Sequence, residues 1–207
     1  MQYDVILSLV EVLVVEADID VIFQEPASRI SLADSTKLTL LVECVKPFDT
    51  APELLVSFTE VSGGSRKHYS YTLRLPITAA AFCDPVVLDS ASYMPRWKAL
   101  EGDGREVQEV FSSVRPVTPD LINHIRTVVV PGLKLGLATG LDSALTVTAC
   151  ASFRTGTPSH DGSGNVAVGA MLRLEGDAAG NRFRITVRAK HPLISKALRN
   201  VLIAELS

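Results

Sequence analysis

The sequence predicts an α+β fold, in which an N-terminal antiparallel β-sandwich of immunoglobulin type precedes a platform of antiparallel strands flanked by short helices. Two observations carry this prediction. Up to about Pro76 the apolar residues alternate with period two, as in strands. Beyond Pro76 segments with helical spacing occur among the strands, which indicates a compact layered α+β unit. We therefore assign residues 1–77 to the sandwich and residues 78–207 to the platform.

The first half is expected to consist of short strands joined by turns. Four segments are predicted as strands, namely Val5–Val15, Lys37–Val45, Glu53–Phe58 and Tyr69–Leu75. The pair Gly63-Gly64 predicts a hairpin turn between the last two. A complete sandwich of this type takes roughly 100 residues, so an edge strand or two is expected to be missing at the start.

The second half is expected to begin with three short helices. Helical spacing of apolar residues places them around Tyr93–Leu100, Val107–Phe111 and Leu121–Ile125. Ser92 is the predicted N-cap of the first, with Pro95 in its opening turn, and Thr118 with Pro119 begins the third. Four strands and a closing helix that starts at Pro192 are expected to follow, with the strands at Thr127–Leu137, Ala144–Phe153, Val166–Leu174 and Arg182–Arg188.

Composition excludes several classes of function. The apolar fraction is 47% and the net charge is only -3, so no overall charge directs the chain to nucleic acid or anionic lipid. The apolar stretch Val5–Val15 is too short to cross a bilayer, and no basic leading region precedes it. We therefore expect a cytoplasmic protein without direct membrane insertion. Three cysteines without CxxC spacing are expected to be buried thiols, namely Cys44, Cys83 and Cys150.

The residues that catalysis needs are scattered. The sequence contains no HExxH, GxSxG or CxxC pattern, and its four histidines lie far apart. We therefore expect no enzyme, no catalytic residue, no cofactor and no metal site, and a small enzyme with an unrecognised site remains the less favoured alternative.

The only tryptophan of the chain indicates a recognition function. Trp97 lies between Arg96 and Lys98 and is followed by a polar stretch, an unusual setting for a core residue. An aromatic ring flanked by cations is suited to a partner that carries both an apolar group and an acid.

A stripe of arginines is predicted close to the end of the chain. In Arg182–Arg188 the arginines alternate with apolar residues, which places them on one face of a strand. A hairpin symmetric about Ala178 and Ala179 would pair Glu175 with Arg182 and place Arg173 opposite Arg184. Opposed like charges are unfavourable in a sheet and would require a compensating anion. Alternatively, the arginines point into water or pair with an unrelated acid such as Glu106 or Glu109.

Several short segments, taken in order, resemble the C-terminal appendage, or ear, of alpha-adaptin, the large subunit of the plasma-membrane clathrin adaptor complex. The similarity covers most of the chain from about Leu40 and is densest in the second half. The matching residues are Glu43-Cys44-Val45, Ala51-Pro52, Leu75-Pro76-Ile77-Thr78, Arg96-Trp97-Lys98, Glu106-Val107-Gln108, Leu172-Arg173-Leu174-Glu175, Arg184 and Arg188.

The resemblance implies a peptide-binding platform. In the family this surface binds Asp-Pro-Phe, Asp-Pro-Trp and Phe-x-Asp-x-Phe motifs in disordered tails of endocytic accessory proteins, in clathrin-coated pits at the plasma membrane. Trp97 matches the tryptophan of the family's pocket, and Met94 stands where a phenylalanine is usual. The other residues implied for the peptide site are Arg96, Arg173, Arg184, Arg188, Glu106, Gln108 and Glu175.

The resemblance also implies partners. These are the accessory proteins and, through the rest of a full-length chain, the remaining subunits of the adaptor complex. A related appendage of another vesicle coat, with a different peptide preference, is the main alternative.

Overall fold

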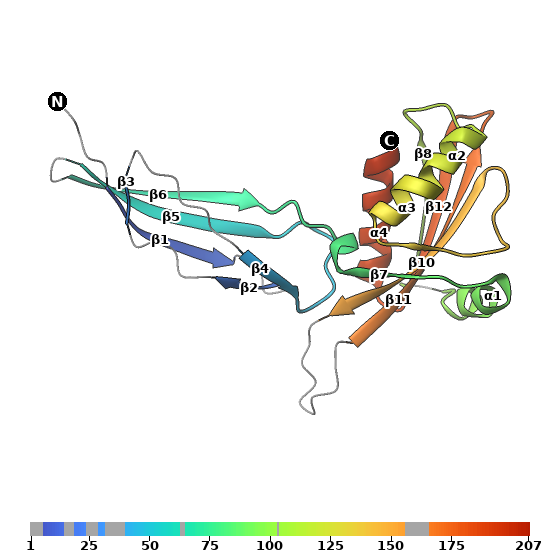
Figure 1. The fold of residues 1–207 in the computed structure, drawn as a ribbon, viewed down its shortest axis with the longest axis horizontal. Helices are drawn as coiled ribbons and strands as arrows, with labels where there is room; N and C mark the ends of the chain where they lie inside the picture. Colours follow the sequence, from blue (N-terminus) through green and yellow to red (C-terminus); the bar gives the residue numbers. More distant parts are fainter. Residues whose placement is uncertain are drawn as a thin grey trace. The chain divides into compact units, whose positions relative to one another are not determined.

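The computed structural model describes residues 6–14, 19–23, 29–31, 40–62, 65–102, 104–155 and 166–207 (Figure 1). Contacts between Cα atoms divide the chain into two compact units. One comprises Met1–Val45 and Ala51–Ile77, and the other comprises Lys46–Thr50 and Thr78–Ser207. The short segment at 46–50 therefore belongs with the second unit, although the sequence places it inside the predicted sandwich.

The first unit is an antiparallel β-sandwich with a four-stranded and a two-stranded sheet. The larger sheet has the order β3-β1-β5-β6, and β2 pairs with β4 in the smaller one. Gly63-Gly64 lies outside the described residues, but Ser62 and Ser65 on either side of it are paired antiparallel. Two of these strands, β2 and β3, were not predicted. The strands are β1 (Ile6–Val14), β2 (Ile19–Phe23), β3 (Arg29–Ser31), β4 (Leu40–Cys44), β5 (Glu53–Ser62) and β6 (Ser65–Arg74).

The second unit is built on a five-stranded antiparallel sheet with the order β7-β10-β11-β12-β8. The alternation predicted for the last two strands is confirmed, because Leu172, Leu174, Ile185 and Val187 are buried on one side. The strands are β7 (Cys83–Val86), β8 (Glu106–Ser112), β10 (Thr146–Thr155), β11 (Val166–Asp177) and β12 (Arg182–Ala189), with the short β9 (Gly136–Leu137) beside β7.

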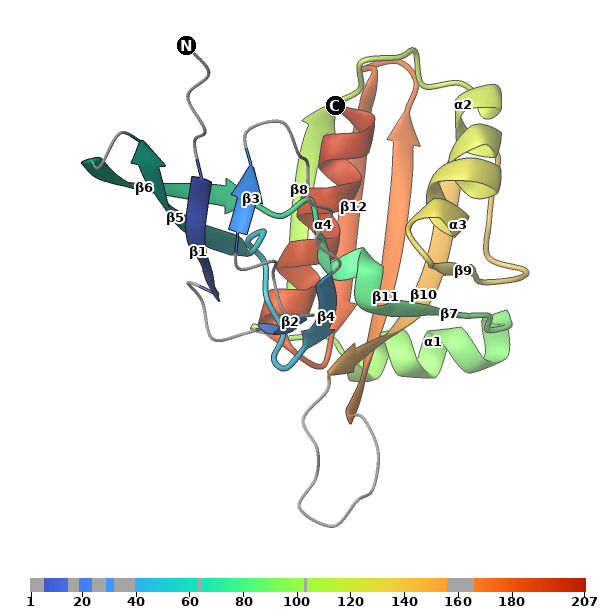
Figure 2. The same cartoon turned by 60° about the vertical axis from the view of Figure 1, so that its left-hand side comes forward.

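Helices cover the two faces of this sheet differently (Figure 2). The long helix α4 (Pro192–Leu206) packs on β12 and β8 with Ile194, Leu198 and Leu202 buried. A helical segment lies on the same side, made of α2 (Pro119–His124), the π-helical turn η2 (Ile125–Val129) and α3 (Val130–Gly132). On the opposite face, α1 (Ser90–Ala99) crosses the sheet near one end. A 3-10 turn, η1 (Ala79–Phe82), precedes β7.

Two predicted elements have the wrong type. The helix predicted at Val107–Phe111 is strand β8, because pairing with β12 determines the conformation there. Most of the strand predicted at Thr127–Leu137 is helical. Its β-branched residues favour a strand locally, but Ile122, Ile125 and Val130 form a buried helical stripe that continues α2.

The predicted starts of two helices are confirmed, and a third start differs. Thr118 caps α2 by accepting from the Leu121 N–H at 3.3 Å, with Pro119 in the first position. Pro192 is likewise the first residue of α4. The N-cap of α1 is Asp89 rather than Ser92, and its Oδ1 accepts from the Ser92 N–H at 2.8 Å. Pro95 consequently lies inside α1 and not in its opening turn.

All three cysteines are buried, as predicted. Burial raises the pKa of the Cys83 thiol and of the Cys150 thiol to about 12, so both are protonated at neutral pH. None of the helices in the described part of the chain is long and apolar enough to cross a membrane.

Candidate functional site

The side of the five-stranded sheet that carries α1 presents an ordered grid of side chains, which we call the α1 face. The pairing register of β10, β11, β12 and β8 sets three rows across it. The first row is Cys150, Met171, Arg188 and Glu106; the second is Thr148, Arg173, Thr186 and Gln108; the third is Thr146, Glu175, Arg184 and Val110.

Helix α1 lies over the first row, where Cys150 and Met171 are buried, and leaves Arg173, Gln108 and Arg184 of the other two rows exposed. Tyr93 anchors the helix, because its ring is 2% exposed and packs against Cys150 and Met171. Its hydroxyl donates a hydrogen bond of 3.2 Å to the Leu172 carbonyl. Burial raises the pKa of this hydroxyl well above its usual range, so it remains a donor.

Trp97 is held between Tyr93 and Arg188. The Tyr93 and Trp97 rings stack with centroids 5.6 Å apart and planes at 19°. The guanidinium carbon of Arg188 lies 4.3 Å from the Trp97 ring centroid, a cation–π contact. Arg188 Nη1 also donates to the Trp97 carbonyl at 2.8 Å. These contacts fix the indole while leaving it half-buried rather than enclosed.

The positive charge of Arg188 is already balanced by acidic residues of the same chain. Only 8% of the residue is exposed, and Nε donates to Glu106 Oε2 at 2.6 Å. The carboxylate of Glu101 lies 3.8 Å from Nη1. A buried cation needs such partners, so removing one of them would leave an uncompensated charge. Arg188 therefore supports Trp97 and has little free capacity to bind an incoming acid.

A depression of about 430 Å³ opens beside the Trp97 ring, and we call it the Trp97 depression. Met94 is half exposed at its edge and supplies a flexible apolar wall. The lining residues are Met94, Pro95, Trp97, Lys98, Glu101 and Arg188. The combination of an aromatic floor, an apolar wall and a lysine at the edge suits an aromatic side chain that has an acid next to it.

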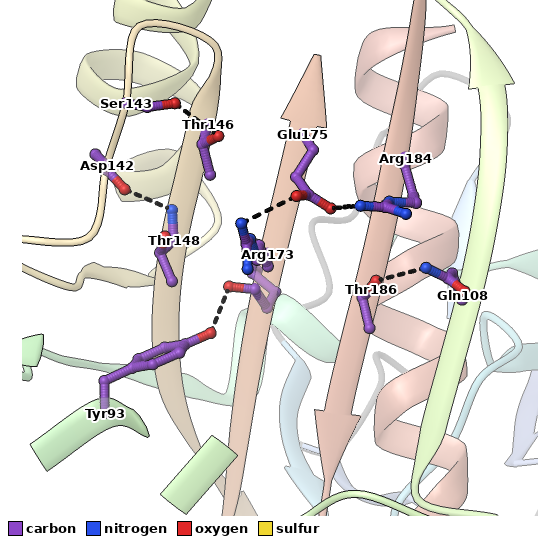
Figure 3. Close-up of polar contacts among 11 residues, drawn as sticks. Tyr93, Gln108, Asp142, Ser143, Thr146, Thr148, Arg173, Glu175, Arg184 and Thr186 are labelled. Carbon is purple, nitrogen blue, oxygen red and sulfur yellow. Dashed lines mark hydrogen bonds and ion pairs between the residues drawn. The ribbon is translucent and has the colours of Figure 1, made fainter. Parts of the chain in front are cut away.

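The second and third rows share a cluster in which one carboxylate contacts two guanidinium groups (Figure 3). Glu175 lies 3.0 Å from Arg173 Nη2 and 2.6 Å from Arg184 Nη2. The side chains of Arg173 and Arg184 are 47% and 52% exposed. Because two cations share one anion, this cluster keeps one surplus positive charge at the open part of the α1 face.

The predicted pairing of these residues is wrong by two positions. Glu175 lies opposite Arg184 and Arg173 lies opposite Thr186, whereas Arg182 pairs with Asp177. The hairpin loop contains the four residues 178–181 and its centre lies one residue later than predicted, because Asp177 accepts from the Gly180 N–H and Asn181 adopts a positive φ of 48°. The anion expected to compensate these arginines is therefore Glu175, a residue of the same chain.

The structure brings most of the nine predicted residues onto the α1 face and separates one of them. Gln108 lies in the second row, where its Nε2 donates to Thr186 Oγ1 at 3.3 Å. Arg96 is the exception, because it lines a different hollow together with Ala99 and Leu100. The roles of all nine residues in peptide binding stay a prediction.

Sequence reasoning missed residues that contribute to the depression or hold it in place. Tyr93, Lys98 and Glu101 lie within four residues of Trp97, and the spacing of Tyr93 to Trp97 is the one local signal for a stacked pair. The position of Val110 in the third row could not be predicted, because it depends on the pairing register of β12 and β8. In the described ranges no group of three or more His, Cys, Asp or Glu residues is placed to hold a metal ion.

Comparison with known proteins shows a family match over most of the platform. The model of "Alpha adaptin AP2, C-terminal domain" matches residues 81–206, which is more than half of the chain. The chain is 27% identical over 164 residues to AP-2 complex subunit alpha-2 of Dictyostelium discoideum, covering 79% of this chain. It is 28% identical over 145 residues to AP-2 complex subunit alpha-2 of Arabidopsis thaliana, covering 66% of this chain. The aligned parts span 15% and 13% of these relatives' lengths.

Proposed function

Since the chain belongs to the family of the alpha adaptin AP2 C-terminal domain, we propose that it is the appendage of a clathrin adaptor. In this proposal it recruits endocytic accessory proteins by binding short aromatic and acidic motifs in their disordered tails. The single observation that carries the proposal is the Trp97 depression, in which a half-buried indole is fixed between Tyr93 and Arg188 and faces solvent beside Met94.

The aromatic residue of the motif would supply most of the binding energy. A Phe or Trp side chain that buries about 150–250 Å² against Trp97 and Met94 gains roughly 4–6 kcal/mol before costs. Ordering a disordered peptide takes back several kcal/mol, so a single motif should bind at about micromolar strength or more weakly. Repeated motifs and clustered adaptors would raise the effective concentration and give reversible assembly.

The acid of the motif would be read chiefly by Arg173 and Arg184. Their guanidinium groups are half exposed and share the carboxylate of Glu175, so each can still donate to a further anion. Arg188 is buried and paired with Glu106, which supports a role in holding Trp97 in place. The two halves of a motif would therefore contact two separate groups of residues.

Methionine labelling offers a sharp test of this site. The chain has three methionines, Met1, Met94 and Met171, so 13C-methyl labelling gives three signals. We expect peptides with Asp-Pro-Phe, Asp-Pro-Trp or Phe-x-Asp-x-Phe to shift the Met94 methyl saturably and to change Trp97 fluorescence. Arg184→Ala should weaken binding several-fold, because it removes one of the two half-exposed cations.

The control is Arg154→Ala, which removes an exposed arginine that pairs with Asp84 at another part of the sheet. Its binding should match that of the wild type. If none of the peptides gave a saturable change at Met94 or Trp97, the proposed site would be refuted. Unchanged binding in Arg184→Ala would refute the acid-reading role and leave the aromatic pocket standing.

The same proposal places the protein peripherally at the plasma membrane, in clathrin-coated pits. The rest of a full-length chain would connect the appendage to the other subunits of the adaptor complex, consistent with the small share of its relatives that this chain spans. Its activity would be protein binding without catalysis. Co-sedimentation of the labelled chain with a motif-bearing tail, with and without competing Asp-Pro-Phe peptide, tests this recruiting activity directly.

A further inference from the structure

A second hollow lies on the other side of helix α1 from the Trp97 depression, and we call it the α1 hollow. It measures about 410 Å³ and lies between the C-terminal half of α1 and strands β7, β10 and β11. Its walls are apolar and include Val86, Leu88, Leu100, Ala151 and Met171. A volume of this size is typical of pockets that take a ligand group.

The sequence of the sheet creates this space. The row of the α1 face beyond Met171 pairs Ser152 with Gly169, so two small residues lie where the sheet passes beyond the cover of α1. A methyl group added to Gly169 would meet no heavy atom within 4 Å beyond its chain neighbours. Gly169 has no positive φ, so its backbone does not require glycine. The missing side chain therefore leaves the hollow unfilled.

The rim of the α1 hollow is basic. Arg96 and Lys190 are exposed side chains among its lining residues, and none of those lining residues is acidic. Neither cation forms an ion pair with the described part of the chain. Asp84, in the neighbouring strand β7, already pairs with Arg154 at 2.8 Å. Two exposed cations beside an apolar floor are complementary to an apolar group flanked by acids.

The α1 hollow and the Trp97 depression lie on either side of the same helix. Arg96 and Trp97 are adjacent residues, yet they line different cavities on opposite sides of the helix. An extended acidic tail that passes over the exposed surface of α1 could therefore reach both cavities. The choice of a peptide as occupant rests on the proposed function, whereas the hollow and its charge do not.

We propose that the α1 hollow is a second peptide subsite, which binds a bulky apolar side chain with acidic residues on both sides in an extended segment. The apolar side chain lies over Gly169 and Met171, and the flanking carboxylates accept hydrogen bonds from Arg96 and Lys190. This subsite recognises aliphatic residues in acidic surroundings and is separate from the aromatic site at Trp97.

The test uses the whole chain and a capped peptide, Gly-Asp-Asp-Leu-Asp-Asp-Gly, that carries no aromatic residue. Met171 lines the hollow and Met94 lines the Trp97 depression, so the labelled methyl signals distinguish the two sites. We expect a saturable shift of Met171 that exceeds that of Met94, with a dissociation constant of about millimolar or tighter. Replacing Leu by Ala, or every Asp by Asn, should weaken binding at least fivefold.

Variants localise the effect. Gly169→Leu should fill the hollow and weaken binding of the leucine peptide at least tenfold, while binding of an Asp-Pro-Phe peptide at Met94 stays unchanged. Gly132→Leu is the matched control, because a side chain there also meets open space but lies in α3 on the other face. Arg96→Gln with Lys190→Gln should weaken the leucine peptide several-fold and reduce its salt dependence. If Gly169→Leu does not fold, Ser152→Leu fills the same hollow from β10.

Three results would overturn the proposal: no saturable shift at Met171, binding by Gly169→Leu and by Ser152→Leu that equals binding by the wild type, or a shift confined to Met94. A Met171 response without any Asp-Pro-Phe response at Met94 would overturn the proposed aromatic site and uphold the hollow. Binding of the chain to phosphatidylserine vesicles that is lost in Gly169→Leu, with no response to the peptide, would show a lipid occupant and contradict the peptide subsite.

Discussion

At the scale of single residues, the basic character of the α1 face depends on how few carboxylates it contains. Arg188 is matched by Glu106, but Arg173 and Arg184 share Glu175 alone. Glu175 therefore has two opposing effects. It keeps the two arginines from repelling each other, and it occupies donors that an incoming acid would use.

Removing this carboxylate should strengthen the capture of acidic motifs. In Glu175→Gln the two arginines lose their shared anion and the open face gains one net positive charge. We expect Asp-Pro-Phe peptides to bind several-fold more tightly, with a steeper loss of affinity as salt is added. Calorimetric titration at two salt concentrations measures both effects.

The matched control is Glu109→Gln. Glu109 lies in β8 of the same sheet, but its carboxylate pairs with Arg199 of α4 at 3.2 Å, on the other face of the sheet. This variant has the same change in net charge, so a purely long-range effect would appear in both. If the two variants bound equally well, Glu175 would not be the local competitor that its geometry suggests.

At the scale of elements, the sequence predicted well what depends on local spacing. The alternation in Arg182–Arg188, the cap at Thr118 and the start of α4 at Pro192 are all local patterns, and they are confirmed. The elements that failed are those whose type is set by a partner. Val107 and Phe111 satisfy helical spacing as well as a strand, and only the pairing with β12 decides between them.

The same distinction between local patterns and pairing partners applies to the residues of the candidate site. Trp97 and the alternating arginines could be recognised from neighbouring residues, but the pairing of Glu175 with Arg184 depends on a four-residue loop. Nothing before the loop shows whether Asn181 adopts a positive φ, and a change of two positions exchanges every cross-strand partner. The separation of Arg96 from the Trp97 depression likewise depends on which side of α1 packs on the sheet.

The start of α1 has a pH dependence with a definite sign. The hydrogen bonds from Ser92 lower the pKa of the Asp89 carboxyl below its usual value of 3.8. Its contribution to stability is therefore complete above that value and is lost as pH falls through the lowered pKa. We expect Asp89→Ala to lower the melting temperature at neutral pH, with a difference from wild type that shrinks below about pH 4.

Thr118→Ala provides the control for this prediction. Thr118 caps α2 through a hydroxyl, which does not titrate in this range, so the deficit of that variant should stay constant as the pH falls. Thermal unfolding followed by circular dichroism between about pH 2 and pH 7 compares the two. A deficit of Asp89→Ala that did not change with pH would contradict the assignment of Asp89 as a charged cap.

At the scale of the whole molecule, the two units do not follow the order of the chain strictly. Segment 46–50 belongs with the platform although the strands before and after it belong to the sandwich. The packing of Phe48 explains this assignment. Phe48 is 5% exposed, and its ring packs edge to face against Phe82 with centroids 5.8 Å apart. Phe82 in turn contacts Phe153 of the platform sheet at 6.3 Å. A platform defined only as residues 78–207 would lack this aromatic contact.

Phe48→Ala should therefore destabilise the unit that contains Trp97, from a position far away in sequence. Deleting a buried phenylalanine side chain costs about 3–5 kcal/mol of stability when the surroundings cannot collapse. Trp97 is the only tryptophan and lies in the platform, so its fluorescence during urea unfolding reports on that unit. We expect the Trp97 transition to move to a lower urea midpoint in Phe48→Ala.

The control is Phe58→Ala, which removes the same kind of side chain from the sandwich. Phe58 stacks there on Tyr69 with ring centroids 5.2 Å apart, and its removal should leave the Trp97 midpoint unchanged. An unchanged Trp97 midpoint in Phe48→Ala would contradict the assignment of segment 46–50 to the platform.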